Sequence, residues 1–216
     1  MKYNKTLQAE FIDRPNRFIA HVSIDGHIET VHVKNTGRCK ELLIKGVTVI
    51  LEESDNPARK TKYDLIAVYK KNFGLINIDS QAPNKVAMEW LKSQDYTYIK
   101  PEFTYGNSRI DFYMERGDER FLMEVKGCTL EKDGVGYFPD APTQRGVKHI
   151  YELIKAKEEG IHSALAFVIQ MEGIDEVLPN VETHLEFGTA MADAKKAGVD
   201  IIFIKCKVFE NRVDCL

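Results

Sequence analysis

The hydrophobic pattern of this chain changes at Gln81-Ala82-Pro83, and that change limits the folds it can adopt more than any other feature. Before it, short apolar runs are separated by turn signals such as Asp25-Gly26. Strands are predicted over residues 18–24, 28–33, 47–51, 65–69 and 75–78, with a short helical segment over 39–44. Five short strands in about eighty residues predict a small closed barrel, of which the OB-fold is a common form.

After this point, helices and strands alternate. Helices are predicted over residues 84–94, 143–159 and 183–197, and strands over 97–105, 109–115, 120–125, 164–171 and 201–205. The order α-β-β-β-α-β-α-β predicts a mixed sheet flanked by helices. We therefore expect a two-domain α+β/α/β protein. Residues 1–82 would form an OB-like nucleic-acid-binding barrel, and residues 83–216 a mixed-sheet domain.

Composition narrows the classes of partner. No run approaches about 18 apolar residues, so no membrane partner is expected, and the start of the chain lacks the apolar core of a secretory signal. Four cysteines without a CxxC pair argue against a disulfide scaffold and a thiolate zinc site, so we expect a cytoplasmic protein. The net charge of −3 hides an asymmetry, because residues 1–82 carry 13 Lys and Arg against 10 Asp and Glu. This basic half predicts modest, salt-sensitive nucleic-acid binding.

A predicted hairpin in the second half carries the strongest chemical signal. A two-residue loop at Gly117-Asp118 would place Asp111 opposite Glu124, with Cβ atoms about 4.5–5.5 Å apart. Arg109 and Lys126 would form the next pair on the same face, since side chains repeat every two residues. Opposed carboxylates repel. Either the two cations make this a solvated, salt-bridged face, or the carboxylates hold a metal ion.

Mg²⁺ or Mn²⁺ is the cofactor that such a site would take. Mg²⁺ binds oxygen ligands at about 2.0–2.1 Å and keeps several waters, so two carboxylates leave positions for a phosphate and an attacking water. Lys126 would point into the same volume. There it could orient or deprotonate the water, or stabilise charge that develops in the transition state.

The residues that carry this chemistry resemble known families. Asp111 followed by Glu124-Val125-Lys126 resembles the PD-(D/E)XK nuclease signature, with Ile110 in place of its leading proline. Longer blocks resemble the sugar fermentation stimulation protein A (SfsA) family: GRCKELL at 37–43, SRIDF at 108–112, EVKG at 124–127 and FPDAPTQRGVKH at 138–149. The resemblance implies an N-terminal OB-like domain and a C-terminal PD-(D/E)XK nuclease-like domain. It also implies an association with DNA binding and with regulation of sugar-utilisation genes.

Further residues are candidates for supporting roles. Glu89 lies on the helix before the three strands, where nucleases of this superfamily often place another carboxylate. Arg145 and His149 share one face of the next helix. Ordinary solvated side chains are the alternative for all three. In the barrel, OB-folds hold single strands in a basic groove, and a solubilising surface is the alternative. The candidate nucleic-acid contacts there are Arg14, Arg17, Lys34, Arg38, Lys60 and Lys62.

The sequence therefore predicts a DNA-binding protein with a metal-dependent phosphodiesterase (nuclease) site formed by Asp111, Glu124 and Lys126. One alternative is a DNA-binding transcriptional regulator that keeps the nuclease scaffold without turnover. Another is a structural use of the same fold, in which Lys126 and Arg109 neutralise the carboxylates. The sequence leaves open whether the DNA is single-stranded, whether RNA is also bound, and the oligomeric state.

Overall fold

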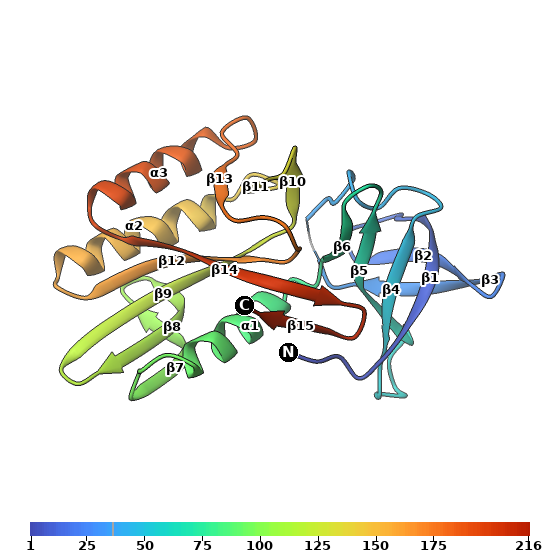
Figure 1. Cartoon of the computed structure of the whole chain (residues 1–216), viewed down its shortest axis with the longest axis horizontal. Coiled ribbons are helices and arrows are strands. Elements are labelled where there is room, and N and C mark those ends of the chain that lie inside the picture. Colours follow the sequence, from blue (N-terminus) through green and yellow to red (C-terminus); the bar gives the residue numbers. More distant parts are fainter. Residues whose placement is uncertain (36) are drawn as a thin grey trace.

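The computed structural model describes residues 1–35 and 37–216, which fold into two halves that lie side by side (Figure 1). The first half contains β1 (Lys5–Asp13), β2 (Ile19–Ile24), β3 (His27–Val33), β4 (Thr48–Glu53), β5 (Tyr63–Lys70) and β6 (Gly74–Asn77). The strand order is β3-β2-β1-β4-β5-β6, and an additional pairing of β3 with β5 closes a five-stranded barrel. The predicted OB-like barrel is confirmed.

Details of the barrel differ from the sequence prediction. Strand β1 was not predicted, because only Ala9 and Phe11 of its nine residues are fully buried. The predicted strand at 75–78 is present as β6, but it pairs only with β5 and lies outside the closed barrel. Residues 39–44 form a turn rather than a helix, in which the N–H of Leu42 donates to the carbonyl of Cys39.

The second half is a six-stranded mixed sheet with helices on both faces. Its order is β15-β14-β12-β9-β8-β7, with β12 parallel to both neighbours. These strands are β7 (Tyr98–Tyr105), β8 (Ser108–Arg116), β9 (Glu119–Cys128), β12 (His162–Ile169), β14 (Asp200–Phe209) and β15 (Arg212–Cys215). The helices are α1 (Ala82–Lys92), α2 (Gln144–Glu158) and α3 (Leu185–Lys196). A small separate sheet joins β10 (Leu130–Lys132), β11 (Val135–Phe138) and β13 (Val177–Pro179). The predicted α-β-β-β-α-β-α-β order is therefore present, with short strands added.

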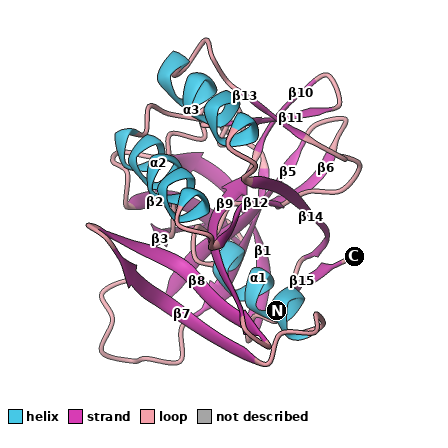
Figure 2. Cartoon of the chain, turned by 90° about the vertical axis from the view of Figure 1, so that its left-hand side faces the viewer, coloured by secondary structure: helices cyan, strands magenta, loops and turns pink. Residues whose placement is uncertain are grey.

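Alternation along β9 places the two apolar cores on opposite faces of this sheet. Leu122 belongs to the core that includes Ile150 of α2, whereas Met123 belongs to the core that includes Val86 of α1. Helix α3 lies beside α2, as Figure 2 shows. No helix within residues 1–35 and 37–216 is long and apolar enough to cross a membrane.

Buried polar side chains join the two halves. Gln170 Nε2 donates to Asn77 Oδ1 at 2.8 Å, and Asn77 Nδ2 donates to the hydroxyl of Tyr3 at 2.8 Å. Tyr3 belongs to the same apolar core as Ile66 of β5 and the face of the second sheet that α1 covers. Strand β5 is therefore buried on both sides, which explains its continuous apolar run.

Candidate functional site

The register of the β8–β9 hairpin brings Asp111 and Glu124 to one place. The paired residues from Phe112↔Met123 to Arg116↔Glu119 follow the predicted register. The described ladder ends at Phe112↔Met123, so the prediction that Asp111 pairs directly with Glu124 is wrong. Instead, Asp111 Oδ2 accepts a hydrogen bond from the backbone N–H of Val125 at 2.8 Å.

Glu124 is 2% exposed, and its two carboxylate oxygens have different surroundings. Oε1 accepts from Lys126 Nζ at 2.5 Å and contacts His149 Nδ1. Oε2 is buried and has no hydrogen-bond partner among the described residues. Burial raises the pKa of Glu124, but the hydrogen bond to His149 and the charge of Lys126 outweigh it and hold that pKa below its usual value. The carboxylate is therefore ionised and only half-satisfied.

Asp111 is held by neutral donors and has the opposite shift. Asn84 Nδ2 on α1 donates to its Oδ1 at 2.9 Å, opposite the contact from Val125. Burial and the nearby charge of Glu124 raise the pKa of Asp111 above its usual value. Two neighbouring carboxylates thus have divergent pKa values, an arrangement that often marks functional sites.

The donor set at Asp111 and Glu124 fits a hard divalent cation. The unpartnered Glu124 Oε2 and the repulsion at Asp111 would both be relieved by a positive ion with oxygen preference. Within the residues that the structure describes, no group of three or more His, Cys, Asp or Glu side chains is arranged to hold a metal. An ion here would therefore take its remaining ligands from water or substrate, as Mg²⁺ commonly does.

The other predicted residues of this half lie around the carboxylates at different distances. His149 is buried and contacts Glu124, and Arg145 Nε donates to His149 Nε2 at 3.4 Å, which leaves Nδ1 as the donor to Glu124. Glu89 is half-exposed and lines the same cavity of about 610 Å³ as Asp111. Arg109 is exposed and pairs with Glu102 at 3.6 Å. The expectation that Arg109 neutralises the carboxylates is wrong, because its side chain turns toward the neighbouring strand.

The sequence reasoning missed Asn84 as part of the site. The predicted helix begins at Asn84, but Gln81 is the N-cap residue of α1, and Asn84 lies inside the first turn. From there its amide reaches Asp111 across the space between α1 and β8. Nothing in the local sequence distinguishes a capping asparagine from one that reaches a neighbouring strand.

In the barrel, three of the predicted cations have partners within the protein, and two of them, Arg14 and Lys34, are held by several contacts. The terminal nitrogens of Arg14 donate to four backbone carbonyls, at 2.5–2.9 Å. Lys34 Nζ lies 3.0 Å from Glu52 and 3.2 Å from Asp64. These contacts hold loops and strands together and leave little donor capacity for a phosphate. Lys60 and Lys62 lie elsewhere, on the loop between β4 and β5, and Lys62 pairs with Glu53 at 3.1 Å.

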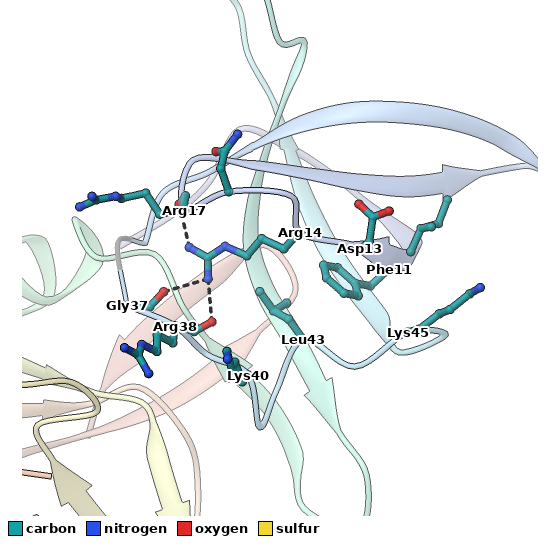
Figure 3. Close-up of a pocket in the computed structure, with 11 residues that line it drawn as sticks. Phe11, Asp13, Arg14, Arg17, Gly37, Arg38, Lys40, Leu43 and Lys45 are labelled. Atoms are coloured by element: carbon teal, nitrogen blue, oxygen red, sulfur yellow. Dashed lines mark hydrogen bonds between the residues drawn. The ribbon is translucent and has the colours of Figure 1, made fainter.

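A basic groove of about 440 Å³ lies on the barrel (Figure 3). Of the predicted contacts, Arg14, Arg17 and Arg38 line it, and Lys40 and Lys45 join them. Arg17, Arg38, Lys40 and Lys45 are exposed and form no salt bridge with any residue the structure describes. The six predicted cations therefore do not form one surface, and the groove contains two lysines that the sequence reasoning left out.

Comparison with known proteins identifies the family. The model described as "SfsA N-terminal OB domain" matches residues 12–78, and the model described as "Sugar fermentation stimulation protein RE domain" matches residues 81–212. The chain belongs to the SfsA family.

Relatives in the family match the chain over nearly its whole length. The sugar fermentation stimulation protein homolog of Desulfitobacterium hafniense strain Y51 is 54% identical, over 99% of this chain and 95% of the relative. The homolog of Clostridium beijerinckii is 53% identical, over 99% and 96%. The structure of Pyrococcus furiosus SfsA in complex with Ca²⁺ is similar with a TM-score of 0.88 and 25% identity, covering 100% of this chain and 95% of that one.

The segment at 138–149, which carried the resemblance to the SfsA family, has both structural and site roles. Phe138 packs against the buried Phe167 and Phe187, and Thr143 caps α2 by accepting from the N–H of Gly146 at 3.1 Å. The helix that this cap starts then carries His149 to Glu124. The first part of the segment therefore fixes where the last part reaches the carboxylates.

Proposed function

We propose that the protein is a nucleic-acid-binding, divalent-metal-dependent phosphodiesterase, with DNA as its substrate and Mg²⁺ or Mn²⁺ as its cofactor. The observation that carries the proposal is the buried, ionised and unpartnered Oε2 of Glu124 next to Asp111. Asp111 and Glu124 would hold the ion. When bound, it would supply Lewis-acid stabilisation of a phosphoryl group and lower the pKa of a bound water.

The chain's own residues have separable roles in this proposal. The ammonium group of Lys126 lies on the Glu124 side of the site, where it can orient an attacking water or stabilise charge on the phosphoryl oxygens. His149 holds the Glu124 carboxylate in place and keeps it ionised. Arg145 lies exposed beside His149, where its guanidinium can approach a substrate phosphate. Glu89 would act only from the cavity that it shares with Asp111.

The barrel would hold the nucleic acid. Its groove presents Arg17, Arg38, Lys40 and Lys45, and cations of this kind bind phosphates with strong salt dependence. The family name of the relatives, sugar fermentation stimulation protein, connects the proposed activity to the control of sugar utilisation.

A second candidate is a DNA-binding regulator that does not cleave the DNA it binds. It is favoured by one observation: Lys126 and His149 both contact Oε1 of Glu124, so they compensate part of its charge without a metal. The two candidates share the nucleic-acid partner and differ in whether phosphodiester bonds are broken.

The deciding experiment incubates the protein with single-stranded, duplex and flapped DNA and with RNA, in Mg²⁺ or Mn²⁺ and in EDTA. Metal-dependent cleavage is expected, and Glu124→Gln and Lys126→Ala should abolish it while leaving nucleic-acid binding within a few-fold of wild type. Binding without cleavage of any of these substrates would overturn the phosphodiesterase and leave the regulator.

A further inference from the structure

The cavity beside Asp111 continues along the exposed face of α1, away from the barrel groove. Asp111 lies next to the first turn of the helix through its bond with Asn84, and Lys92 is the last residue of the helix. Both Asp111 and Lys92 line the cavity, together with Lys2 and Lys85. The space therefore extends from one of the proposed metal ligands along the whole helix.

The three lysines of this groove are free to bind an anion. Lys2, Lys85 and Lys92 are exposed, and none of them forms a salt bridge or hydrogen bond through its side chain with any residue in 1–35 or 37–216. The carboxylates in the groove have partners of their own. Glu89 accepts from the α-amino group of Met1 at 2.6 Å, and Glu102 pairs with Arg109.

The spacing of the lysines suits an extended polyanion. Lys85 and Lys92 are seven residues apart, so they lie on one face of α1, about 10 Å apart along its axis. Met88 lies between them, and Pro101 of β7 forms part of the opposite wall. The groove thus alternates cationic and apolar surface.

We propose that this α1 groove binds a single strand of nucleic acid as it leaves the carboxylates, with backbone phosphates on Lys85, Lys92 and Lys2 and unpaired bases against Met88 and Pro101. A duplex hides the faces of its bases in the stack, whereas a single strand exposes them to apolar contact. The direction of the strand rests on the proposed function. The groove itself is lined mainly by the mixed-sheet half, with Met1 and Lys2 from the start of the chain, and it is distinct from the groove on the barrel.

A smaller cavity of about 170 Å³ at the junction of the halves supports this path. It is lined by Gly37, which also lines the barrel groove, and by Pro83 and Gly127, the sequence neighbours of Asn84 and Lys126. This junction cavity therefore borders the barrel groove through Gly37 and the start of α1 through Pro83, and Gly127 next to Lys126 borders the same space.

The test measures binding separately from cleavage. A fluorescein-labelled oligo-dT single strand and a duplex of equal length are titrated with Glu124→Gln protein, which is expected not to cut, across a range of NaCl concentrations. The same titrations are made after adding Lys85→Gln and Lys92→Gln. The control adds Lys195→Gln and Lys196→Gln instead, which remove from the last turn of α3 two exposed lysines that form no ion pair with any described residue.

We expect the α1 variant to bind the single strand on the order of tenfold more weakly at low salt, with the slope of log affinity against log salt reduced by about 1.4 for two lost phosphate contacts. The α3 control should match its parent. An unchanged affinity and slope in the α1 variant, or an equal loss in the control, would overturn the groove. A loss for the duplex as large as that for the single strand would overturn the single-strand assignment.

Failure of the proposed function would look different. If wild-type protein cleaves nothing in Mn²⁺ but the α1 variant still loses single-strand affinity, the groove stands and the phosphodiesterase falls. Thermal melting of each variant confirms that the exposed substitutions leave the fold intact.

Discussion

Each half of the molecule contains a buried carboxylate that is contacted by a histidine and a lysine. The two carboxylates differ in how many of their oxygens have a partner. In the barrel, both oxygens of Asp64 accept hydrogen bonds from Arg59, at 2.6 and 2.8 Å. His32 and Lys34 also contact this carboxylate. In the mixed sheet, Glu124 is likewise contacted by a histidine and a lysine, but both reach the same oxygen.

This difference separates a structural cluster from a candidate reactive one. Burial would raise the pKa of Asp64, but the hydrogen bonds from Arg59 and His32 and the charge of Lys34 lower it to about 2. No oxygen of Asp64 is left for a further ligand. Glu124 is ionised as well, yet its Oε2 faces no donor in the described part of the chain. A buried charge that is only half-satisfied is costly unless something else binds to it.

The largest expected effect separates the two carboxylates by activity. Glu124→Gln should lower metal-dependent cleavage at least about 100-fold, because it removes the charge that would hold the ion. Asp64→Asn, the matched substitution in the barrel, should leave the cleavage rate of folded protein within a few-fold of wild type. Both rates are measured on the same oligonucleotide in Mn²⁺. Equal losses of cleavage rate in the two variants would contradict a special role for Glu124 in the reaction.

For the free energy of unfolding, we expect Asp64 to matter more than it does for activity. Asp64→Ala strips Arg59 and Lys34 of a buried partner and should cost about 3 kcal/mol in urea unfolding. Since the pKa of Asp64 is depressed, its contribution is fully present above about pH 4 and is lost as the pH falls toward 2. The wild-type stability curve should therefore drop over that window, and the Asp64→Ala curve should drop less. A variant that is as stable as wild type at pH 7 would contradict the structural role.

The two histidines provide a sharper contrast. His149 lowers the pKa of Glu124, so His149→Ala should move the acid limb of the pH–rate profile to higher pH and slow cleavage on the order of tenfold. His32→Ala, which alters the partner of Asp64, should leave that limb in place. The profiles are recorded in Mn²⁺ between pH 5 and 8. An unshifted limb in His149→Ala would mean that the histidine only packs.

The smallest expected effect concerns the second carboxylate of the site. Asn84→Ala removes one donor to Asp111 and should weaken Mn²⁺ binding about threefold to tenfold, as expected for one hydrogen bond that orients a ligand. Asn4→Ala removes an exposed amide–carboxylate bond with Asp55 in the barrel half and serves as the control. Calorimetric titration gives both affinities. Indistinguishable values would leave Asn84 without a positioning role.

Much of this arrangement could be read from the sequence, because it depends on local periodicity. The alternation of Leu122, Met123 and Glu124 and the turn at Gly117-Asp118 are enough to give the hairpin register. The helix that carries His149 follows from its cap at Thr143 and its apolar stripe.

What the sequence could not supply depends on packing between distant segments. The reach of Asn84 to Asp111 depends on how α1 lies on the sheet. Lys34 forms ion pairs with Glu52 and Asp64 only because the barrel closes. A lysine bound to carboxylates and a lysine open to phosphate look the same in sequence, so only part of the predicted basic surface lies in the groove.

The most direct test of the central claim is diffraction from crystals soaked in millimolar MnCl₂, with anomalous maps calculated at the manganese edge. We expect a peak between Asp111 and the Oε2 side of Glu124 in the wild type and no peak there in Glu124→Gln. Well-ordered carboxylates with no anomalous peak between them at millimolar Mn²⁺ would contradict the metal site and leave Glu124, like Asp64, as part of the scaffold.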